Sequence, residues 1–301
     1  MDLRQIEYII KIADEHSITR AAEQLYISQS GLNQQLLKLE KELGQPLFHR
    51  NKYDLRLTEA GSIYVECGRK ILQLKKEAYS RIYDIAGNHS GTLRIGLAPE
   101  RGTTMFLNIY SDFHTMFPGI TIEPSEINVK KQLAMLSKDY LDLGFSTVSE
   151  EDKVPNIEFV HVGYENILLG IPRSHPLAAY ANPPYEAYAT IDLSLFKDDA
   201  FILMSKDSTL RRVIDPLFHK AGFVPKILFE TANNRTLYTM VKTNMGCTLI
   251  PETHAKEQED VAYFLLPDRP QWEMTITYHK DHYISKPIEY FIKLVQNYWS
   301  R

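Results

Sequence analysis

Hydrophobic residues recur at helical spacing through the first part of the chain. The stretch 3–16 places isoleucines on one face, the stretch 17–25 adds a small apolar face, and the stretch 29–43 carries leucines at intervals of three or four residues. This spacing predicts three short helices around a shared core, with a tight turn ahead of the third. Ser17 and Ser28 each precede a helix, and we expect both to cap it by accepting a backbone N–H bond.

Between its leucines the third helix carries amides, a hydroxyl and a cation. The residues concerned are Gln29, Ser30, Asn33, Gln34 and Lys38. Such side chains form hydrogen bonds with base edges and phosphates in the DNA major groove, so we predict that this face binds double-stranded DNA. Ser17, Thr19 and Arg20, at the start of the second helix, are predicted contacts to the DNA backbone. The alternative for Gln29, Ser30, Asn33 and Gln34 is a solvated helix face.

Residues 47–58 have the pattern of a small β-hairpin, with apolar residues on both sides of a polar segment. We interpret this segment as a wing beside the three helices. Its basic tip, with Arg50, Asn51 and Lys52, is predicted to contact the phosphates of a duplex. The alternative is an ordinary hairpin tip.

Residues 59–88 are predicted to form one long helix that Thr58 caps. Its apolar positions follow a heptad-like repeat with one irregular step. They are Tyr64, Cys67, Ile71, Leu74, Ala78, Ile82 and Ile85. A single long helix has no other helix of its own to pack on, so we predict that this seam pairs with a second copy in a homodimer. The alternative is that the apolar stripe packs on its own domain.

The pattern changes after a polar, glycine-containing hinge at residues 87–91. Short strands and helices then alternate, beginning with a strand at 92–97 and a helix at 104–117. A second run of the same kind follows, and in it we expect two separate strands at 157–162 and 167–171. The alternation predicts an α/β region of two lobes, and a cleft between two such lobes is a natural small-molecule site.

Ordered motifs along the chain carry a resemblance to a known family. In the first sixty or so residues they are Ser17-Ile18-Thr19 with Ala21-Ala22, Leu25, Ser28-Gln29-Ser30, Leu39-Glu40, Leu43-Gly44, Leu47-Phe48 with Arg50, and Leu57-Thr58 with Ala60-Gly61. Later landmarks are Gly91 to Gly96, Phe117-Pro118-Gly119, Leu141 to Leu143, His175-Pro176-Leu177, and Leu249 to Glu252. With these motifs the chain resembles, over its full length, the LysR-type transcriptional regulators.

The resemblance implies an α/β fold class with an N-terminal all-α winged helix-turn-helix, a long linker helix and a two-lobed sensor domain like a periplasmic binding protein. The implied domains are 1–58 for DNA binding, 59–90 for the linker and hinge, and 91–301 for effector binding, with lobe I at about 91–160 and 267–301 and lobe II at about 161–266. It further implies a sequence-specific regulator that binds operator DNA. A small-molecule effector bound between the lobes would control it, and it would assemble as a homodimer or a dimer of dimers.

Two features depart from the family pattern. The recognition helix usually carries Ser and then Arg where this chain has Asn33 and Gln34, and amides favour adenine whereas Arg favours guanine. Residues 1–58 contain eight basic and eight acidic side chains, so the DNA-binding domain has no net charge. We therefore expect weak long-range attraction of DNA. Affinity must come from a few placed cations, from helix N-termini and from several DNA-binding domains per assembly.

The best candidates for effector contact follow the first strand of the sensor region. Backbone N–H groups, hydroxyls and the dipole of a helix N-terminus there favour an anionic group, although a simple helix cap is the alternative. The other candidates are strand-end residues expected to face the cleft. The full set is Glu100, Arg101, Thr103, Thr104, Ser125, Asn128, Ser146, Met204, Ser205 and Asn234.

Composition narrows the class of protein further. The 301 residues are 44% hydrophobic with a formal net charge of −4, which predicts a chain that folds throughout and argues against a coat for nucleic acid. Early charged residues leave no secretory segment, and no apolar run is long enough to span a membrane, so we expect a cytoplasmic protein. Cys67 and Cys247 lie far apart and suggest no disulfide framework; Cys67 is expected to pack rather than to act as a redox switch.

Catalytic motifs are missing from the sequence. We find no nucleophile elbow, zinc-protease motif, phosphate loop or dinucleotide fingerprint, and so expect neither an enzyme nor a cofactor. His279 and His282 with Asp281 resemble a partial metal site, but no further ligand is evident. Two rival hypotheses are a solute-binding protein whose N-terminal helices only mediate assembly, and an enzyme on a two-lobed scaffold. The helix-turn-helix motif argues against the first, and the lack of a nucleophile–base pair argues against the second.

Overall fold

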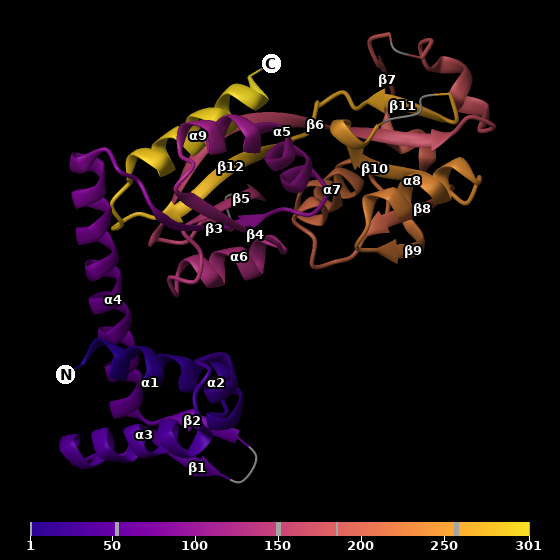
Figure 1. Ribbon diagram of the computed structural model, residues 1–301. Coiled ribbons are helices and arrows are strands. Elements are labelled where there is room, and N and C mark those ends of the chain that lie inside the picture. Colours follow the sequence, from indigo (N-terminus) through magenta and orange to yellow (C-terminus); the bar gives the residue numbers. More distant parts are fainter. Residues whose placement is uncertain (1, 52–53, 149–151, 185, 256–258, 301) are drawn as a thin grey trace. The chain divides into compact units, whose positions relative to one another are not determined.

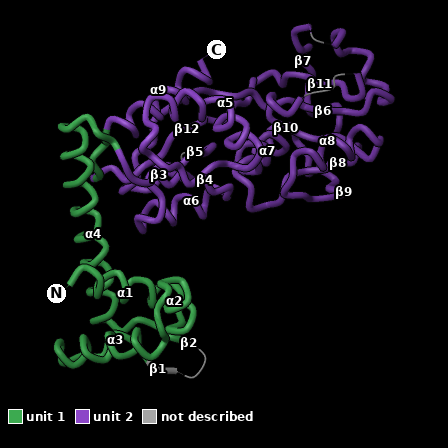
Figure 2. Tube along the Cα trace, viewed as in Figure 1, with its two compact units in different colours: residues 1–89, 282–285 green, residues 90–281, 286–301 purple. Residues whose placement is uncertain are grey.

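The chain divides into two compact units. The computed structural model describes residues 2–51, 54–148, 152–184, 186–255 and 259–300. Unit 1 comprises residues 1–89 with 282–285, and unit 2 comprises residues 90–281 with 286–301 (Figure 2). Over the described residues, no helix is long and apolar enough to cross a lipid bilayer.

Unit 1 begins with the three predicted helices, α1 (Leu3–Glu15), α2 (Ile18–Gln24) and α3 (Gln29–Leu43) (Figure 1). Their apolar faces meet in one core, in which Ile9 and Leu32 are fully buried. The helical repeat therefore predicted both the elements and the face that each one buries.

Both predicted serine caps are present. Ser17 Oγ accepts a hydrogen bond from the backbone N–H of Arg20 at 3.3 Å, and Ser28 Oγ accepts one from the N–H of Gly31 at 3.1 Å. Each bond satisfies a backbone donor that the first turn of a helix leaves without a partner. The caps thus fix where α2 and α3 begin.

The wing is an antiparallel pair of strands, β1 (Phe48–Asn51) and β2 (Asp54–Leu57). A buried carboxylate holds it to the third helix, because Glu40 Oε1 accepts hydrogen bonds from the backbone N–H groups of Leu47 at 2.8 Å and Phe48 at 3.4 Å. Glu40 is therefore a structural residue of α3 and faces the core rather than the solvent.

The long helix α4 (Glu59–Ala86) starts against the same wing. Thr58 caps it by accepting a bond from the N–H of Gly61 at 3.0 Å, while the N–H of Thr58 donates to the carbonyl of Leu47 at 3.0 Å. A Cβ on Gly61 would lie 2.0 Å from that carbonyl oxygen. The helix and the wing approach each other so closely that only glycine fits.

Unit 2 is built on an eight-stranded sheet with the order β4-β3-β5-β12-β6-β11-β7, in which β10 also pairs with β6 (Figure 1). These strands are β3 (Gly91–Leu97), β4 (Ile120–Glu126), β5 (Leu143–Val148), β6 (Ile157–Pro172), β7 (Ala189–Thr190), β10 (Thr248–Pro251), β11 (Val261–Leu265) and β12 (Gln271–His279). A separate parallel pair is formed by β8 (Ala200–Met204) and β9 (Lys226–Thr231). The helices are α5 (Arg101–Met116), α6 (Val129–Leu136), α7 (Thr209–Lys220), α8 (Asn234–Lys242) and α9 (Lys286–Trp299).

Two separate cores divide unit 2 into two lobes. Phe113, Phe145 and Phe291 belong to the first, between α5, α9 and the β3–β5 region. Phe201 and Phe264 belong to the second, under α7 and α8. The two-lobed α/β architecture that the alternating pattern predicted is present.

One predicted feature of the sheet is wrong. The two strands expected at 157–162 and 167–171 are a single strand, β6. Opposite β12, Thr275 pairs with His161 and Met274 with Gly163, so Val162 is an extra residue and forms a bulge. A bulge interrupts the alternation of side chains, which is why the pattern looked like two strands.

The same strand links the two lobes. β6 pairs with β12 through Asn166 and with β10 and β11 from Ile167 onward. Its change of partners therefore falls later than the crossing that was expected near residue 160. A continuous strand, rather than a loop, makes this connection.

The first sensor helix also begins earlier than expected. It was predicted to start at Thr104, but α5 starts at Arg101, after Glu100 in a positive-φ conformation of 61°. The two adjacent threonines look like caps in the sequence, yet the residue at the cap position is Glu100, and its side chain makes no capping bond.

We predict that Gly61→Ala lowers the free energy of unfolding of unit 1 by about 1–3 kcal/mol. The added methyl overlaps a backbone carbonyl that cannot move without shifting the wing. Urea unfolding followed by circular dichroism measures the change in midpoint. The control is Ser62→Ala, at an exposed position in the same helical turn. Equal midpoints for the two variants would contradict the prediction.

Candidate DNA-binding and effector sites

The polar face of α3 is accessible. Gln29, Ser30, Gln34 and Lys38 are exposed, and Asn33 is partly buried beside them. The leucines of α3 point the other way into the core, so the helix is held rigidly while this face remains available. The arrangement is chemically suited to a major groove, where amides and hydroxyls can reach base edges.

The predicted DNA contacts at the start of α2 differ in whether their side chains already bind other groups of the protein. The hydroxyl of Ser17 is committed to its capping bond, and Thr19 is exposed. Arg20 Nε lies 3.9 Å from a carboxylate oxygen of Glu15, and the Arg20 side chain is 63% exposed. Arg20 Nη2 also donates to the backbone carbonyl of Glu15, so Arg20 has to give up these contacts before it can bind a phosphate.

The structure describes the backbone of two of the three residues predicted to contact DNA at the wing tip. Arg50 and Asn51 belong to β1, where they pair with Leu55 and Asp54. Lys52 lies outside the described residues. Contact between these residues and phosphate remains a prediction.

Two of the eight acidic side chains of residues 1–58 are engaged in the fold of unit 1. Glu40 is buried against backbone N–H groups, and Asp14 forms an ion pair with Arg69 of α4, with 2.6 Å between Arg69 Nη2 and Asp14 Oδ1. Asp14 thus has a basic partner outside residues 1–58, whereas Glu40 is held by uncharged backbone groups.

In unit 2, a buried carboxylate gathers three donors from three segments. Glu165 on β6 lies 2.7 Å from Arg101 Nη2 and accepts bonds of 2.8 Å from the indole N–H of Trp272 and from the backbone N–H of Thr253. The Arg101 guanidinium also lies over the Trp272 ring, 4.6 Å from its centre. Burial lowers the pKa of Arg101, and the neighbouring Glu165 carboxylate opposes that shift.

This cluster accounts for Arg101, which was predicted to contact an effector. Its side chain is buried and its guanidinium is bound to Glu165. Arg101 therefore holds the first turn of α5 against β6, and the neighbouring groups are the ones left to meet a ligand.

Those neighbouring groups come from both lobes. Glu100 Oε2 lies 3.4 Å from His254 Nδ1, and His254 Nε2 lies 3.3 Å from the side-chain nitrogen of Asn234. The hydroxyl of Thr103 donates to Glu126 Oε2 at 2.6 Å. The structure thus brings Glu100 and Asn234, far apart in sequence, to the two sides of one histidine.

Other predicted effector contacts are less available. Ser146 is fully buried and donates to Gln132 Oε1 at 2.8 Å, so we remove it from the candidates. Met204 is packed in the core of the second lobe. Asn128 caps α6 by accepting a bond from the N–H of Lys131 at 2.9 Å, which is the simple cap that was the alternative.

The remaining three lie nearer the surface. Thr104 is exposed, and Ser125 and Ser205 are partly buried. They stay candidates without a specific contact that singles them out.

Sequence reasoning missed Glu165, Trp272 and His254. Glu165 had a detectable signal, because it is a lone acid next to the long apolar run 167–171 of β6. A charged residue at such a position has to be paired, since burial of an unpaired charge is costly. Its partners Arg101 and Trp272 lie 64 residues before it and 107 residues after it in the chain, and no local pattern identifies them.

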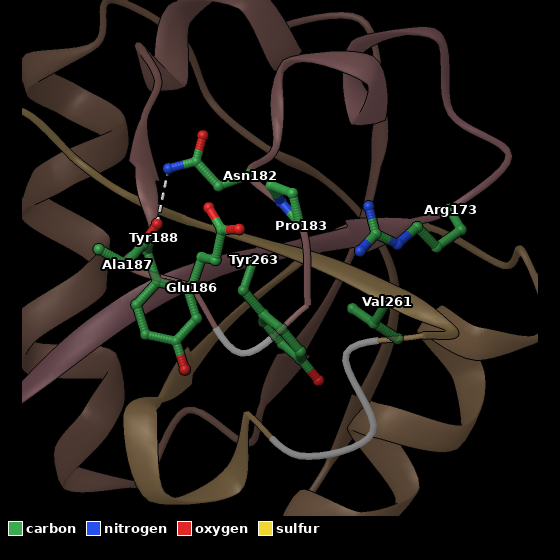
Figure 3. A pocket seen from close by; sticks show the side chains of 8 residues that line it. All are labelled: Arg173, Asn182, Pro183, Glu186, Ala187, Tyr188, Val261 and Tyr263. Carbon is green, nitrogen blue, oxygen red and sulfur yellow. Dashed lines mark hydrogen bonds between the residues drawn. The ribbon is translucent and has the colours of Figure 1, made fainter.

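A hollow in the second lobe is too small for an organic effector. Arg173, Asn182, Glu186, Tyr188 and Tyr263 line it together with three apolar side chains, and Asn182 donates to the carbonyl of Ala187 at 2.7 Å (Figure 3). Its volume is about 10 Å³. That is room for about one water molecule.

The predicted seam of α4 divides into two parts. Tyr64 is buried in the core of unit 1 and Ile71 packs against it, as the alternative reading required. Leu74, Ile82 and Ile85 are 66%, 59% and 88% exposed, and Cys67 and Ala78 are exposed as well. The later part of the seam, from Leu74 onward, is therefore open to a second copy, whereas in the earlier part Cys67 is exposed between two residues that pack in unit 1.

Comparison with known proteins agrees with this architecture. Residues 3–62 match the family described as bacterial regulatory helix-turn-helix protein, lysR family, and residues 86–300 match the LysR substrate binding domain. The chain belongs to the LysR family of transcriptional regulators. The HTH-type transcriptional regulator YwbI of Bacillus subtilis (strain 168) is 30% identical over 302 residues, which cover 99% of this chain and 97% of that protein.

Solved structures share the fold of this LysR regulator. Full-length OxyR C199D from Pseudomonas aeruginosa has a TM-score of 0.69 at 21% identity, over 99% of this chain and 94% of that one. Full-length CbnR complexed with its target DNA has a TM-score of 0.60 at 23% identity, over 99% and 100%. The helix-turn-helix, long helix and two-lobed domain thus recur in the same order.

We predict that Glu165→Gln destabilises the sensor domain of this LysR regulator by about 3–5 kcal/mol, because Arg101 would become a buried charge without a counter-ion. Urea unfolding of the full chain measures the loss. The double variant Arg101→Met with Glu165→Leu should recover only the part of the loss that comes from the unpaired charge, because the N–H groups of Trp272 and Thr253 still lose their acceptor.

Glu289→Gln is the matched control, because Glu289 pairs with Lys293 on the exposed surface of α9. This control should leave the unfolding midpoint unchanged. If Glu165→Gln behaves like Glu289→Gln, the buried pair does not hold α5 against β6 as described.

Proposed function

We propose that this LysR regulator binds operator DNA through the polar face of α3 and that a small molecule bound beside the first turn of α5 controls its output. The observation that carries the proposal is the exposed row of amide, hydroxyl and cationic side chains on a helix fixed by the Ser28 cap and the leucine core. A gel-shift experiment with the intergenic DNA upstream of its own gene tests it. Failure to shift that duplex at low salt would refute DNA binding.

Base readout is assigned to the first half of α3. Asn33 and Gln34 stand where the family usually has Ser and Arg, and their amides can make paired hydrogen bonds to adenine. Operators of this regulator should therefore be richer in A·T pairs at the contacted positions. Lys38, further along the helix, is assigned to phosphate contact.

We predict that Asn33→Ala relaxes base preference, with a loss of about 1–3 kcal/mol on the preferred operator and little change on other sequences. Lys38→Ala should weaken binding to all sequences alike and reduce the slope of log K against log salt by about 1. Titrations of operator and scrambled duplexes at several salt concentrations measure both effects.

Lys293→Ala in the sensor domain is the matched control, since it removes the same charge from an exposed helix outside residues 1–89. It should leave both duplex affinities unchanged. Equal losses on every sequence for Asn33→Ala and Lys38→Ala would remove the distinction between base and phosphate contact.

The effector site is proposed at Glu100, Thr103 and Asn234 with His254 between the lobes. Support comes from the proximity of these groups and from the match of residues 86–300 to a substrate binding domain. An anionic effector has to displace the Glu126 carboxylate from the Thr103 hydroxyl, because that bond already occupies the hydroxyl. A thermal-shift screen of small acids and amino acids identifies ligands, since binding raises stability by mass action.

We further propose that the later part of the α4 seam pairs two copies in a homodimer, which can associate again into a dimer of dimers. Its support is the run of exposed apolar side chains at Leu74, Ile82 and Ile85. Large apolar side chains repeated along one helix are typical of an interface. Pairing would also join two DNA-binding domains, which raises affinity without added charge.

We predict that Ile82→Glu weakens self-association at least about tenfold, because the charge would be buried at the interface. Sedimentation equilibrium of the full chain measures it. Gln73→Glu, which adds the same charge elsewhere on α4, is the control. If both variants remain as associated as the parent, the seam is not the interface.

The same proposal places the regulator in the cytoplasm, where bacterial DNA lies, and assigns it no catalytic activity of its own. The support is its family, whose members named above are regulators, together with the lack of a nucleophile and base pair in the sequence.

A further inference from the structure

A short sensor-domain loop is packed on the end of the linker helix. The chain enters unit 2 after His89, leaves it after Asp281, and enters it again at Lys286. The four residues 282–285 connect β12 to α9, which both belong to unit 2, but they belong to unit 1. The chain therefore passes between the two units three times, and two of these crossings are the two ends of this loop (Figure 2).

The loop is fastened to α4 through a buried carboxylate. The hydroxyl of Tyr283 donates to Asp84 Oδ2 at 2.9 Å, and the side chain of Asp84 is only 5% exposed. His89 Nδ1 lies 3.2 Å from the other oxygen of Asp84. The guanidinium of Arg81 lies over the Tyr283 ring, 4.5 Å from its centre.

Asp84 occupies an unfavourable position unless these partners are present. It lies in the last turn of α4, where the helix dipole disfavours a negative charge. Burial adds a desolvation cost to that repulsion. A carboxylate at such a site is tolerated because donors compensate it, and the Tyr283 hydroxyl is a donor from outside α4 and its hinge.

The other end of the same strand lies in the buried cluster of the sensor. β12 runs from Gln271 to His279, and Trp272 near its start donates to Glu165. A strand rises about 3.4 Å per residue, so β12 spans on the order of 25 Å between that cluster and the loop. It is paired on both sides, with β5 and β6, and cannot bend freely between its ends.

We propose that Tyr283 is a positioning residue that couples the sensor domain to the linker helix by fixing the β12–α9 loop to Asp84. The inference rests on the proposed function, in which a ligand near the Glu165 cluster changes how the DNA-binding domains are held. A change at Trp272 is transmitted along β12 to the loop, and the Tyr283–Asp84 bond transfers it to the end of α4. Without that bond the hinge at residues 87–91 absorbs the change.

A double-mutant cycle followed by hydrogen–deuterium exchange tests the coupling in the full chain, without DNA or effector. Trp272→Phe removes the indole N–H that reaches Glu165 and perturbs the sensor end of β12. Tyr283→Phe removes only the hydroxyl that reaches Asp84. Tyr290→Phe is the matched control, because it removes a hydroxyl from a partly buried tyrosine of α9 that packs on Phe113 and Phe117.

Trp272→Phe is expected to speed exchange of the amides of residues 84–89 by about threefold or more when Tyr283 is present, and by much less in the Tyr283→Phe background. Tyr290→Phe should preserve the full effect. If the Tyr283 hydroxyl had only a structural role, Tyr283→Phe would by itself speed exchange at residues 84–89. Trp272→Phe would then add the same increment in both backgrounds. Such an unchanged increment, or no increment in the parent, would overturn the proposal.

Gel shifts with the upstream duplex on the parent and the three variants of the Trp272–Tyr283 cycle separate this inference from the proposed function. Loss of DNA binding by the parent would refute the proposed function, and the exchange cycle would still decide the coupling. Retained DNA binding with an additive exchange cycle would refute the coupling alone.

Discussion

The sensor domain depends on the pairing of one buried carboxylate, Glu165. It lies on the strand that both lobes share, and it receives donors from α5, from β12 and from the segment after β10. A carboxylate removed from water needs such partners, so the position of each segment is constrained by the other two. The same bonds bury Arg101 and leave Glu100 and Thr103 at the surface of the first turn of α5. The geometry of the proposed effector site thus follows from the needs of a residue that is not itself expected to touch the effector.

The DNA-binding domain has a similar dependence on Glu40. This residue looks, in the sequence, like one of eight acids that cancel the basic charge, but in the fold it joins the recognition helix to the wing. Its two hydrogen bonds fix the start of the wing against α3. Together with Gly61, it sets the distance between the DNA-binding elements and the start of α4.

Local patterns predicted the elements well where one physical rule governs them. The repeat of Leu32, Leu36 and Leu39 and the caps at Ser17 and Ser28 gave the helices of unit 1, because cap and core are both encoded within a few residues. β6 was divided wrongly because the bulge at Val162 depends on its partner strand. The Glu165 cluster was missed for the same reason, since its members meet only after folding. Ser146 looked like a strand-end contact, and only the packing of α6, through Gln132, shows that it is buried.

The chain has two tryptophans, Trp272 and Trp299, and their surroundings differ. One indole lies against a guanidinium and donates to a buried carboxylate, and the other is stacked on Phe145 with 5.9 Å between ring centres. Neither belongs to residues 1–89. The tryptophan fluorescence of the protein is therefore a property of the sensor domain alone, and DNA contact by the helix-turn-helix changes it only if the change is relayed to that domain.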